Sequence, residues 1–305
     1  MIRPLAILAL ALLGSIVAAM LWQHGRYVHA RRELVQDRQP LLHSGDVFHV
    51  VIFLELAPGT DLFESVRELR DRLEAGDTAR MVYAGKVALN AQPSRQLIEA
   101  FGEAVPWDAV VCVQFASREA FDRVDLERAL DGFARTYAHG MQRSALGNLM
   151  VPQLLLAKRL GQLVTRAPSL LPFEPAPPDE WVIPRDGRFA RLDAERELGE
   201  HAAVVVNLTL PGTPEQAAAD RGYVDRMFGL MAEVGHGPMH MGRAVTLERS
   251  ARFENVALVY YPGVEYFRRM VESRFYQGIV GGKQLGDTQA SITVPILGRL
   301  GAPAG

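Results

Sequence analysis

The chain has 305 residues, of which 49% are hydrophobic and 22% charged, and its formal net charge is −2. This is the size of about two globular domains, and the near-neutral charge lacks the basic excess of a nucleic-acid-binding protein, so we expect no nucleic-acid partner. The single cysteine, Cys112, excludes an internal disulfide, and its apolar surroundings in "AVVCVQF" favour inert packing.

Residues 1–23 are predicted to form a transmembrane anchor. The segment from Pro4 to Trp22 carries no charge, is just long enough to cross a bilayer as a helix, and ends on an interfacial aromatic residue. A cleaved signal peptide is the competing interpretation, because Val17-Ala18-Ala19 has the small residues of a cleavage site. We favour the uncleaved anchor, because the apolar run continues beyond that site.

Residues 24–46 are predicted to form a polar, basic stalk. Arg26, Arg31 and Arg32 follow the apolar segment, whereas only Arg3 precedes it. By the positive-inside rule this favours a single-pass protein of the bacterial inner membrane, with a soluble body that is cytoplasmic rather than periplasmic.

Residues 47–155 and 200–298 are predicted to be two copies of one unit. The sequence "VALVYYPGVEYFRRM" at 256–270 aligns without a gap on "VVCVQFASREAFDRV" at 110–124. Three shorter pairs keep the same order: "AGKVAL" with "MGRAVTL", "LAPGTDLF" with "LPGTPEQ", and "LMVPQLL" at 149–155 with "ITVPILG" at 292–298. Such ordered self-similarity indicates an internal duplication.

Each copy is predicted to run strand, helix, strand, strand, helix, strand, with Val-Pro in the last strand. In the second copy Thr213, Pro214 and Gln216 have the pattern of a capping box at the start of a helix that ends at Gly235. The order is the βαββαβ ferredoxin-like arrangement, whose antiparallel sheet has helices on one face only. We therefore predict an α+β fold in which two tandem ferredoxin-like units cover each other as one intramolecular α/β barrel.

The connector at 156–199 is predicted to be helical at first and then extended and proline-rich. Its amphipathic start, "LLLAKRLGQLV", fits either a membrane-surface helix or a helix packed on its own domain, and we favour the second. Residues 299–305 are predicted to be a disordered tail.

The stretch "FENVALVYYPGVEYFRRMVESRFYQGI" at 253–279 resembles a large bacterial family of small, uncharacterised dimeric α/β-barrel proteins. The resemblance covers residues 200–297 and lies in Phe253, Tyr261-Pro262 and the serine-tyrosine-glutamine pattern that begins at Ser273. The first copy lacks that pattern and has Ala116 where the family has proline. The resemblance implies a fold and no single reaction, because the wider superfamily includes cofactor-free monooxygenases, isomerases, haem-handling enzymes and binding proteins.

The sheet face turned away from the helices lines a cavity in such a barrel. His240, opposite Tyr83 of the first copy, is the candidate catalytic residue, because an imidazole in a cavity can act as a general base near neutral pH. A histidine held in the core is the competing interpretation. In "VVVNLTL" the fully apolar side is expected to face the helices, which would direct Asn207 into the cavity. The candidate ligand-binding residues are Asn207, Tyr260, Tyr83 and Tyr276.

A structural role is favoured for Ser273, Tyr276 and Gln277, with Ser273 capping a new helical turn. No metal site is predicted, because His236 and His240 flank a glycine and a proline that oppose a helix, and no further ligand lies nearby. No cofactor is predicted either, although haem binding through His240 or His139 is a third hypothesis.

The leading functional hypothesis is a membrane-anchored ligand-binding or protein-interaction module, because no complete catalytic constellation is present. Its partners would be the membrane, through the N-terminal helix, and a small apolar ligand or a protein. The alternative is a cofactor-free monooxygenase or isomerase that uses His240 on a small apolar substrate in the barrel cavity.

Overall fold

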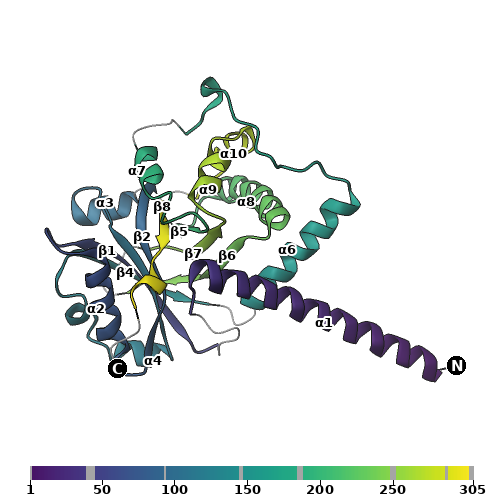
Figure 1. Cartoon of the computed structure of the whole chain (residues 1–305), viewed down its shortest axis with the longest axis horizontal. Coiled ribbons are helices and arrows are strands. Elements are labelled where there is room, and N and C mark those ends of the chain that lie inside the picture. The colour runs from purple at the N-terminus through teal and green to yellow at the C-terminus, as the bar shows by residue number, and fades with distance from the viewer. Residues whose placement is uncertain are drawn as a thin grey trace.

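Eight strands close into one antiparallel barrel in the computed structural model, which describes residues 2–38, 45–92, 94–143, 147–183, 188–247, 252–285 and 288–301 (Figure 1). The order around the barrel is β1-β3-β2-β8-β5-β7-β6-β4. The strands are β1 (Phe48–Leu56), β2 (Ala79–Gln92), β3 (Ala109–Phe115), β4 (Phe133–Gln142), β5 (Ala203–Thr209), β6 (Gly237–Val245), β7 (Asn255–Tyr261) and β8 (Thr288–Pro295).

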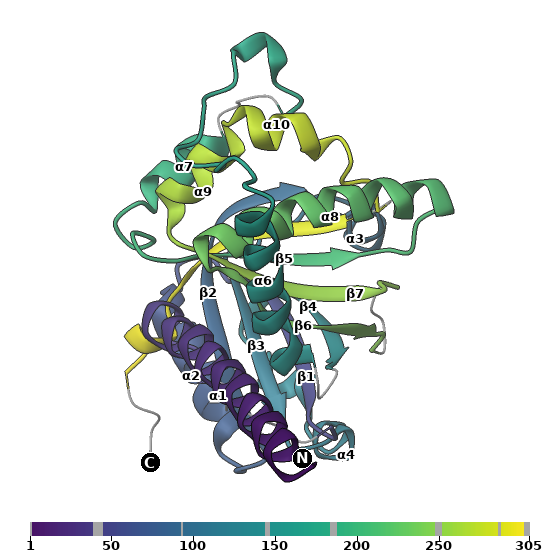
Figure 2. The same cartoon turned by 90° about the vertical axis from the view of Figure 1, so that its right-hand side faces the viewer.

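Helices cover the outside of the barrel on two sides, and α1 and α6 lie on a third (Figure 2). The helices are α1 (Ile2–Val35), α2 (Leu62–Glu74), α3 (Arg95–Phe101), α4 (Arg118–Asp122), α5 (Leu126–Ala129), α6 (Gly147–Val164), α7 (Arg188–Ala194), α8 (Pro214–Val234), α9 (Val264–Val271) and α10 (Arg274–Val280). Short 3₁₀ turns occupy Pro178–Glu180 and Leu297–Arg299.

The barrel consists of two halves with the same strand order. The first half reads β4-β1-β3-β2 and the second reads β8-β5-β7-β6, so each places its own four strands in the order 4-1-3-2. That order, with a helix after the first and third strand, is the ferredoxin-like unit. The predicted α+β fold with two ferredoxin-like units in one barrel is thus the fold observed.

Side-chain alternation along the strands separates an apolar barrel interior from two helix layers. On β5, the side chains of Val204, Val206 and Leu208 face the barrel interior. There they belong to one hydrophobic cluster with residues of the first half such as Phe53 and Trp107. The intervening side chains of β5 pack against α8 and α9. Because the interior is itself a hydrophobic core, both faces of each sheet bury apolar residues.

The two seams between the halves differ in length. The β2–β8 seam has six register pairs, whereas the β4–β6 seam has three among the described residues. Glycines lie at the short seam: a Cβ at Gly242 would lie 2.4 Å from the carbonyl oxygen of Gln142, and one at Gly140 would lie 2.9 Å from the carbonyl oxygen of Val245. The close approach of β4 and β6 therefore requires residues without side chains.

The last strand of the first half is not where the Val-Pro match predicted it. Residues 149–155 lie in α6, and the strand is β4 instead. Val151 and Leu155 are both buried and lie four residues apart, so a helical period rather than a strand period places them in the core. In the second half the Val-Pro pair does lie in the last strand, at Val294 and Pro295.

The N-terminal helix is longer than predicted. α1 continues to Val35 through the first part of the predicted stalk, and Tyr27, Val28 and Val35 are buried. Residues 39–44 of that stalk lie outside the described residues. Within the described part of the chain, none of the helices combines the length and the apolarity needed to cross a membrane, so the predicted transmembrane helix has no support here.

The first residues of the predicted disordered tail contact the rest of the fold. Leu300 is buried, and the carbonyl oxygen of Gly301 accepts a hydrogen bond of 2.7 Å from Arg70. This contact ties the chain after the last 3₁₀ turn to α2. Residues 302–305 of the predicted tail lie outside the described residues.

Candidate functional site

A buried polar network surrounds His240 at one end of the barrel interior. The His240 side chain is fully buried; its Nδ1 lies 2.7 Å from Arg143 Nη1 and its Nε2 lies 3.4 Å from Asp37 Oδ2. Arg143 directly follows β4, and Asp37 lies two residues after α1. The network therefore joins three segments that are far apart in the sequence.

The protonation of His240 follows from its partners. The Arg143 guanidinium can only donate, so Nδ1 accepts and the proton of the neutral ring is on Nε2, facing Asp37. Burial lowers the pKa of His240 to about 4, against an opposing effect of Asp37. Burial also lowers the pKa of Arg143, to about 10. Near neutral pH the imidazole is thus neutral, with a guanidinium at one nitrogen and the carboxylate of Asp37 facing the other.

An irregularity in β6 gives the network its second anchor. The register of β6 against β7 shifts between Pro238 and His240, which leaves the backbone of Met239 outside the regular ladder. Its carbonyl oxygen accepts hydrogen bonds of 3.1 Å from both Arg31 and Arg143. Arg31 belongs to α1, so the bulge fixes the helix to the barrel.

The end of α1 packs over this end of the barrel. The Tyr27 hydroxyl donates to the carbonyl oxygen of Pro238 at 2.6 Å, on β6. Arg38 donates to the carbonyl oxygen of Met81 at 3.0 Å, on β2, and Val35 belongs to the interior cluster. Together these contacts hold residues 27–38 against strands of both halves.

Tyr83 and Tyr260 also face the barrel interior. The Tyr83 hydroxyl lies 2.6 Å from Thr293 Oγ1, and burial raises the pKa of Tyr83 above its usual range. The Tyr260 hydroxyl donates to the carbonyl oxygen of His201 at 3.4 Å, and burial raises its pKa to about 12. His240, Tyr83 and Tyr260 thus all lie on the interior side of the barrel; a catalytic role for His240 and a ligand-binding role for the tyrosines stay predictions.

Asn207 lies on the opposite face of β5 from the one predicted. Its Oδ1 accepts a hydrogen bond of 3.0 Å from Lys283 Nζ, in the helix layer, and burial lowers the pKa of Lys283. The prediction was wrong because it assigned the fully apolar side of the strand to the helices. In this barrel the interior takes that side.

Tyr276 is also outside the barrel interior, on α10 in the helix layer, with its ring 6.4 Å from that of Tyr223. Ser273 is the N-cap of α10 and accepts from the backbone N–H of Tyr276 at 3.2 Å. The Gln277 side chain accepts from the backbone N–H groups of Val182 and Ile183. This motif thus joins α10 to the connector.

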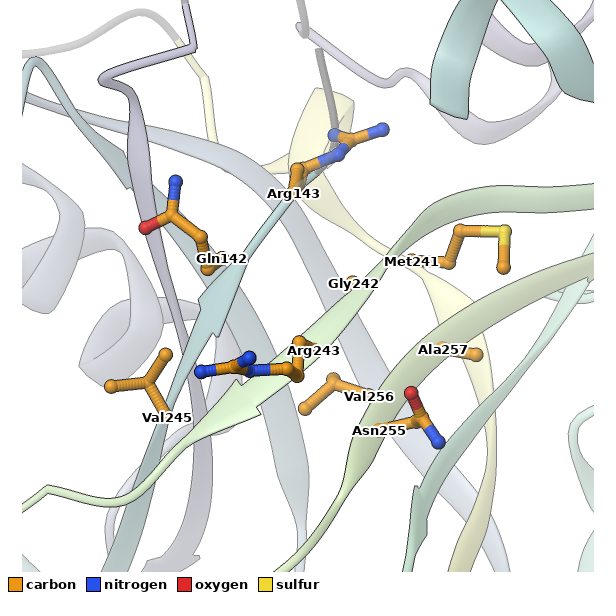
Figure 3. A pocket seen from close by; sticks show the side chains of 9 residues that line it. All are labelled: Gln142, Arg143, Met241, Gly242, Arg243, Val245, Asn255, Val256 and Ala257. Atoms are coloured by element: carbon orange, nitrogen blue, oxygen red, sulfur yellow. The ribbon is translucent and has the colours of Figure 1, made fainter. Parts of the chain in front are cut away.

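An open groove of about 700 Å³ lies where β4, β6 and β7 meet (Figure 3). Met241 and Arg243 alternate along β6 with the inward-facing His240, so they project from the outer face of the barrel. Met241 is 42% exposed. The other lining residues are Gln142, Arg143, Gly242, Val245, Asn255, Val256 and Ala257. Arg143 thus belongs both to the groove and to the His240 network.

No group of three or more His, Cys, Asp or Glu side chains suited to a metal occurs among the described residues. For haem, neither candidate ligand is accessible. Both nitrogens of His240 face other side chains, and His139 is fully buried with its Nδ1 3.0 Å from the carbonyl oxygen of Gly140. Neither histidine is therefore placed to act as the axial ligand of a haem iron.

No protein-family model and no curated protein sequence matches the chain. Among solved structures it is similar to a protein of unknown function from Rhodopseudomonas palustris, with 19% identity, 38% of this chain and 96% of the other covered, and a TM-score of 0.32. It is also similar to a mutant chlorite dismutase from Candidatus Nitrospira defluvii, with 11% identity, coverage of 86% and 97%, and a TM-score of 0.42.

A dye-decolorizing protein from V. cholerae gives the same identity and TM-score, with coverage of 85% and 97%. At these identities and scores the likenesses carry no argument about activity or cofactor. The fold that the sequence resemblance implied is the fold observed, whereas membership of the family of small dimeric α/β-barrel proteins stays a prediction.

Asp37, Arg31 and Arg143 are the members of the network that the sequence interpretation missed. Arg31 and Asp37 were assigned to the stalk. The spacing of Tyr27, Arg31 and Val35, four residues apart on one helix face, is the signal that indicates a packed helix there. For Arg143 the sequence holds no comparable signal.

Proposed function

We propose that this chain is a binding module attached to a lipid bilayer by the N-terminal part of α1. The observation that carries the proposal is a continuous run of apolar side chains, each 46–68% exposed, on a helix that projects from the barrel (Figure 1). The run comprises Ile7, Leu8, Leu10, Leu12, Leu13, Ile16, Val17, Leu21 and Trp22. Scattered exposed apolar residues are ordinary, but a contiguous patch of this kind is typical of an interaction site.

The other end of the same helix supports an oriented attachment. α1 is continuous from the apolar run to Val35, and Tyr27 and Arg31 bond it to β6. A bilayer that holds the first turns would therefore hold the barrel in a fixed orientation. This attachment accounts for the predicted membrane partner, and a bacterial inner membrane with a cytoplasmic body remains the expected location.

Co-flotation with phosphatidylcholine vesicles tests the attachment. The full chain should float with the vesicles, and Leu13→Glu combined with Ile16→Glu should leave it in the dense fraction. Val182→Glu is the matched control, because Val182 is also exposed, at 59%, but lies in the connector. A full chain that stays dense, or a double variant that floats as well, would refute the proposal.

The groove between β4, β6 and β7 is the proposed ligand site of the module. Its volume of about 700 Å³ is within the range of small-molecule sites. Met241, Val245 and Ala257 supply apolar wall, and Arg243 supplies a cation. These groups suit a small ligand with an apolar body and an anionic group.

The fluorescent dye anilinonaphthalene sulfonate has this chemistry and serves as the probe. Arg243→Gln should weaken dye binding about five- to tenfold, the loss of one charge-assisted hydrogen bond. Arg123→Gln, an exposed arginine after α4, should leave binding unchanged. If the Arg243 variant and the parent chain bind the dye with equal affinity, the groove is not the ligand site.

The enzyme alternative has less support than the binding module. A general base is most effective when its pKa is near the working pH, whereas the pKa of His240 is lowered to about 4. Both of its nitrogens also face Arg143 and Asp37. Oxygenase or isomerase turnover by the purified chain that disappears in His240→Ala would reverse this preference.

A further inference from the structure

α6 presents a second uncovered apolar surface on the side of the molecule from which α1 projects. In both views α1 and α6 lie on the same side of the barrel (Figures 1 and 2). The exposed apolar side chains of α6 are Met150, Leu154, Leu160, Leu163 and Val164, and Val164 is 83% exposed. The helix thus has the apolar face of an interfacial helix.

α6 is hydrogen-bonded to both α1 and α8. Gln153 Nε2 donates to the carbonyl oxygen of Met20 at 2.9 Å, which ties α6 to α1. Gln162 Nε2 donates to the carbonyl oxygen of Gly229 at 2.9 Å, which ties it to α8. The two apolar surfaces therefore lie on helices that contact each other directly.

A cleft of about 690 Å³ lies between α1, α6, the end of α8 and the end of β7. Arg26 and Arg159 line it from the two helices. The Arg26 guanidinium stacks over the Trp22 ring at 4.8 Å, and Arg159 donates to Gln162 Oε1 at 3.4 Å. Among the described residues, neither guanidinium forms an ion pair with a carboxylate.

The two carboxylates that line the cleft already have local partners. Glu33 Oε1 lies 3.1 Å from His29 Nε2, one turn away on α1. The Glu233 carboxylate accepts from the backbone N–H of Leu170 at 3.1 Å and from the Ser169 hydroxyl. The partners of both carboxylates are thus groups other than Arg26 and Arg159, which leaves the two guanidinium groups able to donate to a ligand.

We infer that this cleft binds the phosphate of an anionic phospholipid of the bilayer to which α1 is attached. The guanidinium group of an arginine can donate two parallel hydrogen bonds to two oxygens of the same phosphate. Trp22 and Arg26, one turn apart, stand at the end of the apolar run, where an interfacial aromatic residue and a headgroup contact are expected. The apolar faces of α1 and α6 would contact the acyl chains beside it. The inference rests on the proposed attachment.

Vesicle binding distinguishes the inference from the attachment itself. The full chain should bind phosphatidylcholine vesicles through α1, and should bind vesicles that contain phosphatidylglycerol more tightly. Arg26→Gln and Arg159→Gln should each reduce that preference on the order of five-fold, without changing binding to phosphatidylcholine. Arg32→Gln is the control, because Arg32 is an exposed cation of α1 that does not line the cleft.

Binding to neither kind of vesicle would overturn the attachment and this inference with it. If the full chain binds both kinds of vesicle with equal affinity, or if Arg32→Gln reduces the preference for anionic vesicles as much as the cleft variants do, the cleft is not the phosphate site, although the attachment stands. Inorganic phosphate should not compete with the anionic vesicles; competition would show that the cleft takes free phosphate instead. The double variant Leu160→Glu with Val164→Glu should bind both kinds of vesicle more weakly. Unchanged binding would show that α6 is not part of the surface that contacts the membrane.

Discussion

His236 makes the stability of this protein depend on pH. Its side chain is 1% exposed, and its ring centroid lies 4.9 Å from that of Tyr261 and 5.4 Å from that of Tyr266. Within the described residues neither ring nitrogen has a hydrogen-bond partner. Burial lowers the pKa of His236 from 6.5 to about 3.

The size of the effect follows from proton linkage. In the unfolded chain His236 takes up a proton below about pH 6.5, whereas in the folded chain it stays neutral down to about pH 3. The unfolded state therefore binds more protons between these values, so stability is complete above the unfolded pKa and falls as the pH is lowered. Each pH unit is worth about 1.4 kcal/mol, so the loss from about pH 7.5 to about pH 4.5 is roughly 2–3 kcal/mol.

The variant His236→Phe keeps an aromatic ring and removes the titration. Urea unfolding of the full chain in detergent micelles, followed by circular dichroism over this pH range, gives the free energy of unfolding. The variant should lose roughly 2–3 kcal/mol less than the parent chain on acidification. His240 titrates in both proteins and cancels, and His29→Phe, at an exposed position, is the control. Parallel pH profiles for parent and variant would refute the reasoning.

Three further predictions concern the network, the family motif and the short seam. Asp37→Ala removes the carboxylate that faces the buried His240 and opposes the charge of the buried Arg143, and should cost about 3–5 kcal/mol of unfolding free energy in urea titrations. The exposed Glu33→Ala should cost under about 0.5 kcal/mol, and a similar cost for both would contradict a buried network. Ser273→Ala removes the N-cap of α10 and should lower stability by about 1 kcal/mol in thermal unfolding; an unchanged midpoint would speak against the cap. Gly242→Ala forces a Cβ against the β4 backbone, so it should lower the free energy of unfolding by about 1–3 kcal/mol and speed hydrogen exchange in β4 and β6. Gly222→Ala, at a position on α8 with open space around it, should leave stability unchanged or raise it. Equal exchange rates in the two variants would contradict the prediction.

The order of the elements was predictable because the two copies repeat the same local signals. Thr213 and Gln216 form the expected capping box, and Gly235 ends α8 in the left-handed conformation. The barrel followed from the sheet face that each unit leaves uncovered. These features depend on residues close together in the sequence.

The side of the barrel that each residue occupies was harder to predict. The sequence directs Asn207 into the interior only if the fully apolar side of β5 faces the helices, and that assumption was wrong. Both faces of β5 are buried, so alternation indicates that two faces exist but not which is which. The position of Lys283, which holds Asn207, depends on tertiary structure.

The His240 network was only partly predictable for the same reason. His240 itself was located on its strand by the repeat. Its partners Asp37 and Arg143 lie in segments outside the repeat alignment, and they meet only when the barrel closes. Contacts between segments that are far apart in the sequence produce no helical or strand periodicity from which they could be predicted.

The unequal seams have a consequence for how this protein can evolve and move. In a symmetric dimer of a single unit, both seams would be the same contact, so any change in one would appear in the other. Joining the two units in one chain removes that constraint. Among the described residues the long seam has six register pairs and the short one has three, and the short seam borders both the groove and Arg143. Mutations in one seam are therefore free of any matching change in the other, and the short seam can vary while the long one is kept.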